Sequence, residues 1–218
     1  MNDEAYKVDF TTLKKQVRLT VLLDAAEEAG LAPMPVLRLH AFAYLANVLA
    51  PVWELPPLEG KVLKRRGGPF YPTLQHDLDR LIGLGVAIIF GVSHVQNEDG
   101  HWRLEGSYRL HKKFGKPILN ALSYFPEENR MRVFIQEVAF ALSALGADEI
   151  DRAMLEDATY SDPVPGLGNV IDFAEWKKIN YSTNAANAFD RFMPLSASPG
   201  NKLHLYVSHL YRRAHGDR

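Results

Sequence analysis

The chain has 218 residues, of which 47% are hydrophobic and 23% charged, and its formal net charge at pH 7 is −1. This composition is typical of a globular protein and unlike that of a disordered one. So small a net charge gives no overall field to attract nucleic acid or an anionic membrane. The absence of cysteine excludes disulfide bonds, thiolate metal ligands and cysteine nucleophiles.

The amino-terminal sequence MNDEAYKVDF is polar and acidic, whereas a secretory signal combines basic residues with an apolar segment. No uninterrupted apolar run approaches the ~20 residues that span a bilayer. We therefore expect a cytoplasmic protein that does not associate with membranes.

Helical periodicity predicts two helices early in the chain, at residues 13–29 and 36–49. The second is apolar on almost every side, which is typical of a helix that several neighbours bury. Two polar residues within it, His40 and Asn47, are interpreted as hydrogen-bonded core groups rather than ligands or catalytic groups.

Residues 61–92 read as a basic strand, a turn, a short helix and a buried strand. Residues 67–69, Gly-Gly-Pro, are expected to interrupt regular structure, because glycine adopts positive φ and proline lacks an N–H donor. The helix is expected at residues 72–84 and the buried strand at 86–90, followed by a returning strand at 102–110. A helix followed by such a hairpin forms the second half of a winged helix.

Beyond residue 112 the pattern predicts helices only. They are expected at residues 117–124, 126–145, 147–157, 173–192 with a break at 181–187, and 201–214. The fold class is therefore predicted as mainly α within an α+β protein. A winged-helix-like domain at residues 1–112, with a β-hairpin wing, is expected to pack on an all-helical domain at residues 113–218.

Basic residues provide the strongest binding signal in the sequence. The candidate DNA- or partner-binding residues are Lys61, Lys64, Arg65, Arg66, Lys112, Lys113 and Lys116. One interpretation joins them into an electropositive face that suits phosphates. The other is a solvated edge strand whose charges prevent aggregation. Asp77 and Asp79 on the candidate recognition helix, and the acidic tip at residues 97–99, disfavour base reading, so any DNA contact is expected through the backbone.

The motifs predict no catalytic residue, no cofactor and no metal. Gly60-Lys61 and Gly115-Lys116 lack the Ser or Thr that follows in a phosphate-binding loop, so the chain is not expected to be an ATPase itself. His76-Asp77, with Asp79, leaves one enzymatic alternative, a metal-dependent hydrolase. That chemistry requires further His and Asp ligands that the sequence does not place.

Residues 39–92 also resemble a known family, the middle components of bacterial ABC-three-component defence systems, of which Lamassu is the best-known type. The match covers about a quarter of the chain strongly and the helical half in outline. The features that carry it are Tyr44-Leu45-Ala46-Asn47, the basic strand, Gly68-Pro69-Phe70-Tyr71-Pro72, and Leu78-Asp79-Arg80-Leu81 before Gly85.

The resemblance implies a non-enzymatic accessory subunit of an anti-phage complex. Such a subunit binds a structural-maintenance-of-chromosomes-like (SMC-like) ATPase and engages an effector, often a nuclease, and double-stranded DNA is a further expected partner through its backbone. The alternative is a stand-alone transcription regulator that uses a winged helix on operator DNA.

Overall fold

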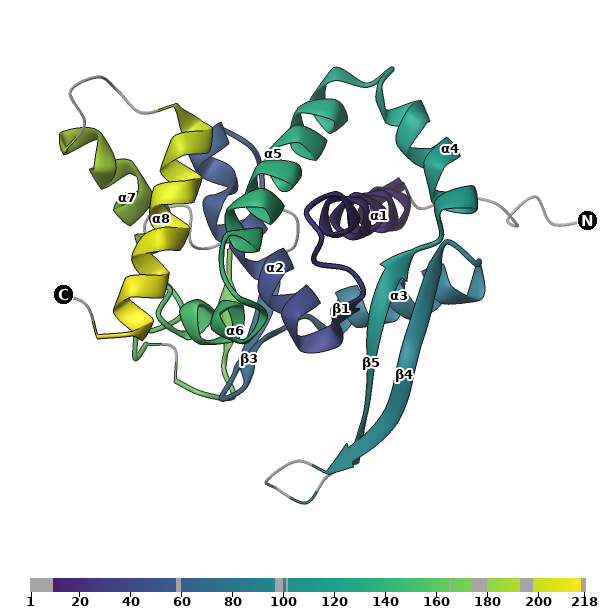
Figure 1. Ribbon diagram of the computed structural model, residues 1–218, viewed down its shortest axis with the longest axis horizontal. Coiled ribbons are helices and arrows are strands. Elements are labelled where there is room, and N and C mark those ends of the chain that lie inside the picture. Colours follow the sequence, from purple (N-terminus) through teal and green to yellow (C-terminus); the bar gives the residue numbers. More distant parts are fainter. Residues whose placement is uncertain are drawn as a thin grey trace, which may run out of the picture.

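The computed structural model describes residues 10–57, 60–96, 100, 102–164, 166–173, 180–192 and 198–216, without the side chains of residues 102–104. It is mainly helical, with 61% helix and 16% strand in small antiparallel sheets, which agrees with the predicted α+β class. Figure 1 shows a helical body from which one long hairpin projects.

The bounds of the elements follow the sequence pattern closely in most places. The helices are α1 (Phe10–Glu28), α2 (Val36–Leu49), α3 (Pro72–Gly83), α4 (Lys112–Leu122), α5 (Pro126–Ser143), α6 (Ala147–Leu155), α7 (Tyr181–Ala188) and α8 (Pro199–Ala214), with 3-10 turns η1 (Ala50–Trp53) and η3 (Phe189–Arg191). The strands are β1 (Met34–Pro35), β2 (Lys61–Arg65), β3 (Gly68–Phe70), β4 (Ala87–Gln96), β5 (Trp102–Leu110) and β6 (Val170–Asp172).

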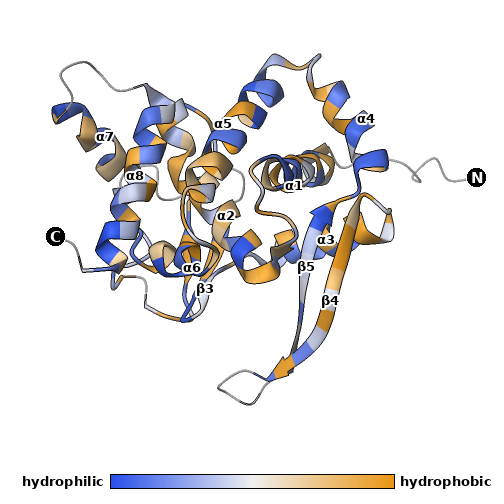
Figure 2. Ribbon diagram, in the orientation of Figure 1, coloured by the Kyte–Doolittle hydropathy of each residue, from blue (hydrophilic) through white to orange (hydrophobic). Residues whose placement is uncertain are grey.

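Helix α2 forms the centre of the core, as its sequence predicts. All of its residues except Leu37 and Arg38 are buried, and it packs against β3, β5, α5, α6 and α7. Full burial of a side chain such as Phe42 or Leu45 contributes about 1.5–3 kcal/mol. Figure 2 shows apolar colouring along much of this helix, which lies in the middle of the molecule.

The apolar segment Val36–Trp53 passes the length and hydropathy test for a membrane span, with a mean hydropathy of 1.3. However, 72% of it is buried within the fold, and β3, α5, α6 and α7 cover it on several sides. The segment is therefore the core helix α2 with the 3-10 turn η1 that follows it, and it packs as a core helix of a soluble protein does.

The first sheet has the strand order β1-β5-β4 and contains the projecting hairpin. The returning strand β5 matches its prediction, whereas β4 runs beyond the predicted residue 90 and is mostly exposed from there on. Phe90 pairs with Ser107 and Ser93 pairs with Glu105, so β4 has one extra residue in a β-bulge between them. Gly91, with φ of 58°, provides the left-handed conformation in this bulge.

The second sheet has the order β3-β2-β6 and corrects two predictions. Strand β2 is central rather than an edge strand, because β6 pairs with its outer side. Gly68 and Pro69 belong to strand β3 instead of a turn, which is possible because β3 is an edge strand and an edge tolerates a residue without an N–H donor. Since β6 lies beyond residue 112, that part of the chain is not all-helical.

The remaining differences lie in the carboxyl-terminal helices. Helix α4 begins at Lys112, with Pro117 inside it rather than near its start. Helix α7 occupies the predicted break, and the side chain of Asn180 caps it by accepting a hydrogen bond from the N–H of Thr183 at 2.9 Å. The predictions for residues 97–99, 174–179 and 193–197 lie outside the described residues.

The two predicted domains share a core and a sheet. Helices α1 and α2 pack against α5, and α2 also packs against α6 and α7. Strand β2 pairs with β6 across the predicted boundary. The boundary at residue 112 itself stays a prediction.

Candidate functional site

The alternation of side chains along strand β2 separates the first group of basic residues, Lys61, Lys64, Arg65 and Arg66. Val62 and Lys64 lie on the buried face of the sheet, whereas Lys61 and Arg65 are exposed on the opposite face. Arg66 is exposed in the turn that leads to β3. We call Lys61, Arg65 and Arg66 the β2 cationic surface.

Lys64 does not belong to that surface, which corrects its place among the candidate contacts. Only 6% of the residue is exposed, and its Nζ donates a hydrogen bond to the carbonyl oxygen of Asp162. The same Nζ lies 5.5 Å from the centre of the Tyr160 ring. Burial lowers the pKa of Lys64, an effect that the charge of Asp162 opposes. Lys64 therefore fastens β2 to the 157–169 loop.

Arg65 is held in place by two neighbours. Its guanidinium carbon lies 3.7 Å from the centre of the Phe70 ring, in a cation–π contact. Its backbone N–H donates to the Tyr160 hydroxyl at 3.1 Å, and that hydroxyl donates to the Arg65 carbonyl oxygen. A guanidinium that packs over a ring retains its planar set of donors, which suits carboxylates and phosphates.

Lys61 has a weaker attachment. Its Nζ lies 3.4 Å from Oδ2 of Asp172 on the neighbouring strand β6, while 73% of the Lys61 side chain is exposed. An ion pair this exposed contributes little to stability, so a more strongly charged partner can replace it.

The second basic group lies elsewhere. Lys112, Lys113 and Lys116 are exposed on the first turns of α4, which packs against α1 and α5. Lys112 lies 3.9 Å from Glu27, which also accepts two hydrogen bonds from Arg109 at 2.6 and 2.8 Å. Figure 1 shows α4 at the upper right of the molecule and β3 at its lower side, well apart from each other. The structure therefore does not bring the two basic groups into one face.

The candidate recognition helix α3 exposes fewer acidic side chains than the sequence indicates. Asp77 is buried and accepts a hydrogen bond from Gln16 of α1 at 3.2 Å, so it does not face a ligand. Asp79 is exposed and accepts from Gln75 at 3.0 Å. His76 is exposed on the same helix. Within the described ranges, no three His, Asp or Glu side chains gather closely enough to hold a metal ion.

His40 and Asn47 position the β2–β3 hairpin, which confirms their interpretation as core groups. Nδ1 of His40 accepts the backbone N–H of Tyr71 at 3.1 Å, so the ring proton lies on Nε2, which is 3.4 Å from the side-chain oxygen of Gln75. Burial lowers the pKa of His40 to about 4, although the Gln75 hydrogen bond opposes the shift. Asn47 donates to the Tyr71 hydroxyl at 2.6 Å. Together they fix the residue that joins β3 to α3.

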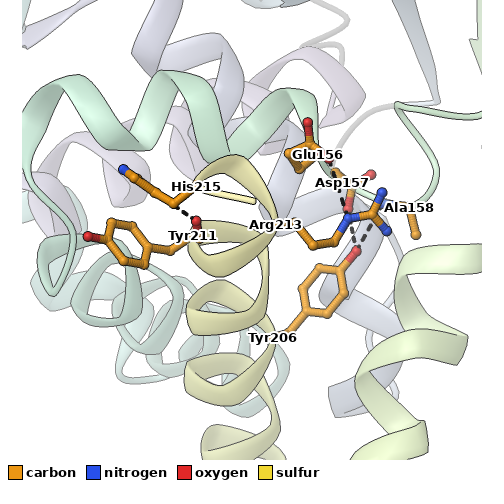
Figure 3. Close-up of polar contacts among 7 residues, drawn as sticks. All are labelled: Glu156, Asp157, Ala158, Tyr206, Tyr211, Arg213 and His215. Atoms are coloured by element: carbon orange, nitrogen blue, oxygen red, sulfur yellow. Dashed lines mark hydrogen bonds and ion pairs between the residues drawn. The ribbon is translucent and has the colours of Figure 1, made fainter. Parts of the chain in front are cut away.

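Sequence reasoning missed a buried carboxylate, Asp157, that supports the same surface. Its oxygens accept hydrogen bonds from the hydroxyls of Tyr44 (2.6 Å), Tyr206 (2.7 Å) and Ser182 (2.9 Å) and from the backbone N–H groups of Thr159 and Tyr160 (both 3.0 Å). Figure 3 shows the Tyr206 hydroxyl directed at Asp157 and at the backbone of Ala158. Burial, followed by the charge of Asp157, raises the pKa values of both tyrosines, so both hydroxyls remain donors.

A chain of contacts therefore leads from the core to the surface. Asp157 holds the backbone of Tyr160, and the hydroxyl of Tyr160 holds the backbone of Arg65. No local signal in the sequence identifies Asp157, because its partners come from helices far along the chain.

Comparisons with protein-family models, with curated proteins and with solved structures found no match to this chain. The function is therefore inferred from the site itself and from the sequence resemblance.

The arrangement favours binding over chemistry. Lys61 and Arg65 are four residues apart on one face of β2, about 13 Å along the strand, and Arg66 extends the surface into the turn. An anionic surface with charges at that spacing, such as a row of phosphates or carboxylates, can meet them together. The buried histidine and carboxylate beneath them serve to fix the backbone.

Proposed function

We propose that this protein is a non-catalytic accessory subunit of an ABC-three-component defence complex. In this proposal it docks on an SMC-like ATPase and engages an effector such as a nuclease, and the β2 cationic surface contacts the ATPase or the backbone of double-stranded DNA. The exposed, anchored guanidinium of Arg65 is the observation that carries the proposal.

The residues of the family-like motifs support this surface directly. Tyr44 binds Asp157, Asn47 binds Tyr71, and Phe70 lies against the guanidinium of Arg65. Each of these contacts fixes the β2–β3 hairpin or the loop beside it. The motif residues thus have a physical role, because they hold the cationic hairpin in place.

The topology supports a winged-helix interpretation of the first half. The order α1, β1, α2, α3, β4, β5 and the sheet order β1-β5-β4 are those of a winged helix, in which the first short strand pairs with the last. The β2–β3 hairpin is then an insertion between the second and third helices. It places the cationic residues beside the third helix rather than on it.

A pull-down from cells that express the native operon tests the proposal. The test variant is Arg65→Glu with Arg66→Glu, and Lys64 stays unchanged because it is buried. The control is Arg152→Glu with Arg212→Glu, which makes the same charge change at exposed positions of α6 and α8, outside both basic groups. We expect the parent and the control to recover the ATPase, and the proposal fails if the parent recovers none.

The test variant separates the two targets of the surface. If Arg65 and Arg66 face the ATPase, the variant elutes alone. If they face DNA, the variant assembles normally but binds DNA less tightly and with a shallower dependence on salt. A variant that assembles, binds DNA and protects cells like the parent removes the surface from the proposal. Tight binding of the isolated parent to upstream DNA, but not to random DNA, would instead support the transcription regulator.

A further inference from the structure

The outer edge of β4 is open. In the first sheet β5 lies between β1 and β4, and within the part of the chain that the structure describes no strand pairs with the other side of β4. Strand β4 has ten residues, which is long for a strand at the edge of a sheet. Its outer backbone N–H and C=O groups therefore form a template for another strand.

The edge lacks most of the features that normally prevent such pairing. The strand sequence AIIFGVSHVQ contains no Lys, Arg, Asp, Glu or Pro. Phe90 is 42% exposed and Val92 is 52% exposed, so the strand presents apolar side chains to solvent. Figure 2 shows the apolar colouring along much of β4. The bulge at Gly91 is the one protective feature, and it divides the edge into two four-residue runs on either side of it.

The hairpin also has room for a neighbour. Figure 1 shows its distal part clear of the helices, with β4 on the outer side. In antiparallel pairing about a twofold axis, two such hairpins overlap while their helical bodies lie at opposite ends.

We infer that β4 pairs with β4 of a second copy of this chain, which joins two three-stranded sheets into one across a twofold axis. The charge pattern favours this occupant. In an antiparallel twofold pair, residues at equal distances on either side of the axis lie opposite each other, so both members of every cross-strand pair come from this one strand sequence. Because that sequence has no formal charge, no register brings like charges together, and the net charge of −1 per chain adds little repulsion.

The mass of the purified protein in solution gives the first test. At about 100 µM, well above a micromolar dissociation constant, light scattering should give twice the 24.5 kDa chain mass. The variant Phe90→Lys with Val92→Lys should raise the dissociation constant at least ~10-fold, because four lysines then lie within one two-stranded interface. The control, Phe140→Lys with Val133→Lys on α5, changes the same residue types at 44% and 40% exposure and should remain dimeric.

The absence of native cysteine permits a second test that does not depend on a variant losing the dimer. Single cysteines at Val92, Ser93 and His94 should form an intermolecular disulfide at the position nearest the axis, since a disulfide requires Cβ atoms about 4 Å apart. Ser143→Cys, on exposed α5, is the control and should not cross-link.

Three outcomes overturn the inference. The first is a parent protein that is monomeric at every concentration, as it would be if a strand of a different protein occupied the edge. The second is a dimer that survives the paired lysines on β4 while the α5 control dissociates. The third is that none of the three β4 cysteines cross-links faster than Ser143→Cys. Dimerisation that β4 substitutions abolish, with a cross-link confined to one or two neighbouring β4 positions, establishes it.

Discussion

Replacing Asp157 by alanine tests whether the buried carboxylate holds the molecule together. The side chain is fully buried, and its five bonds join α2, α7 and α8 to the 157–169 loop. Asp157→Ala removes one acceptor from each of these five donors. The Ser182 hydroxyl has a second acceptor, Oγ1 of Thr159 at 2.7 Å, and the Thr159 N–H has one in Oγ of Ser182 at 3.2 Å. Three donors are therefore orphaned, the hydroxyls of Tyr44 and Tyr206 and the N–H of Tyr160.

The magnitude follows from the three donors. An unsatisfied buried donor costs at least about 1 kcal/mol, so Asp157→Ala should lower the free energy of unfolding by about 3 kcal/mol. Removing a buried charge offsets part of this loss of unfolding free energy, whereas tyrosine hydroxyls left without an acceptor add to it. The change is large against the roughly 5–15 kcal/mol of a typical domain. Tyr206→Phe removes one donor to Asp157 and the acceptor of the Ala158 N–H, while the other donors to Asp157 stay paired, so it should cost about 1–2 kcal/mol.

Urea unfolding followed by tryptophan fluorescence measures these differences as shifts of the midpoint at constant slope. If Asp157→Ala does not fold, Asp157→Asn keeps one acceptor oxygen and should give an intermediate loss. Asp151→Ala is the control, because Asp151 is an exposed partner of Arg38 and its loss should cost less than about 1 kcal/mol. A loss below about 1 kcal/mol for Asp157→Ala would refute the reasoning.

Two further predictions concern single buried positions. The pKa of His40 falls from 6.5 to about 4 on folding, so the unfolded chain binds the proton first as the pH is lowered. The free energy of unfolding should therefore decrease by about 3 kcal/mol in total as the pH falls from about 6.5 to about 4. Urea midpoints measured through this range should show the loss, and His40→Gln should reduce it. Gly115→Ala places a Cβ 2.6 Å from Cδ1 of buried Leu110 and should destabilise the protein by about 1–3 kcal/mol. In Gly83→Ala the new Cβ meets nothing within 4 Å, so this variant should be more stable than the parent by up to about 1 kcal/mol in the same assay. Equal effects of the two glycine substitutions would contradict the packing around α4.

Elements with a strong periodic pattern were predictable from the sequence. The bounds of α2 and β5 agree with prediction, and the buried residues of α8, Leu203, Tyr206, Val207 and Leu210, are those on its apolar stripe. In each case an apolar face long enough to repeat decides the structure locally. His40 and Asn47 could also be interpreted correctly, since polar groups on an all-apolar helix must find partners.

Elements that depend on distant pairing were not predictable. Strands β3 and β6 have three residues each, and both form because β2 lies between them, with β6 more than one hundred residues away in the sequence. Without β6, β2 reads as an edge strand. Helix α7 has a polar, small-residue sequence that its cap and its packing against α2 and α8 stabilise.

Three of the four basic residues at positions 61–66 could be assigned to the surface from the sequence. Lys61, Arg65 and Arg66 are exposed as predicted, but Lys64 shares the buried face of β2 with Val62. Strand alternation alone places Lys64 on that face, yet only the structure provides the Asp162 carbonyl that makes its burial tolerable. The separation of the α4 lysines from β2 is a property of the tertiary fold.

Native mass spectrometry of the assembly purified through this chain, from cells that express the native operon, tests the central claim most directly. The account predicts a complex whose mass includes this chain and an SMC-like ATPase, and which dissociates when Arg65→Glu and Arg66→Glu are introduced if that surface faces the ATPase. Recovery of the parent chain without any ATPase, as a monomer or as a dimer of itself alone, would contradict it.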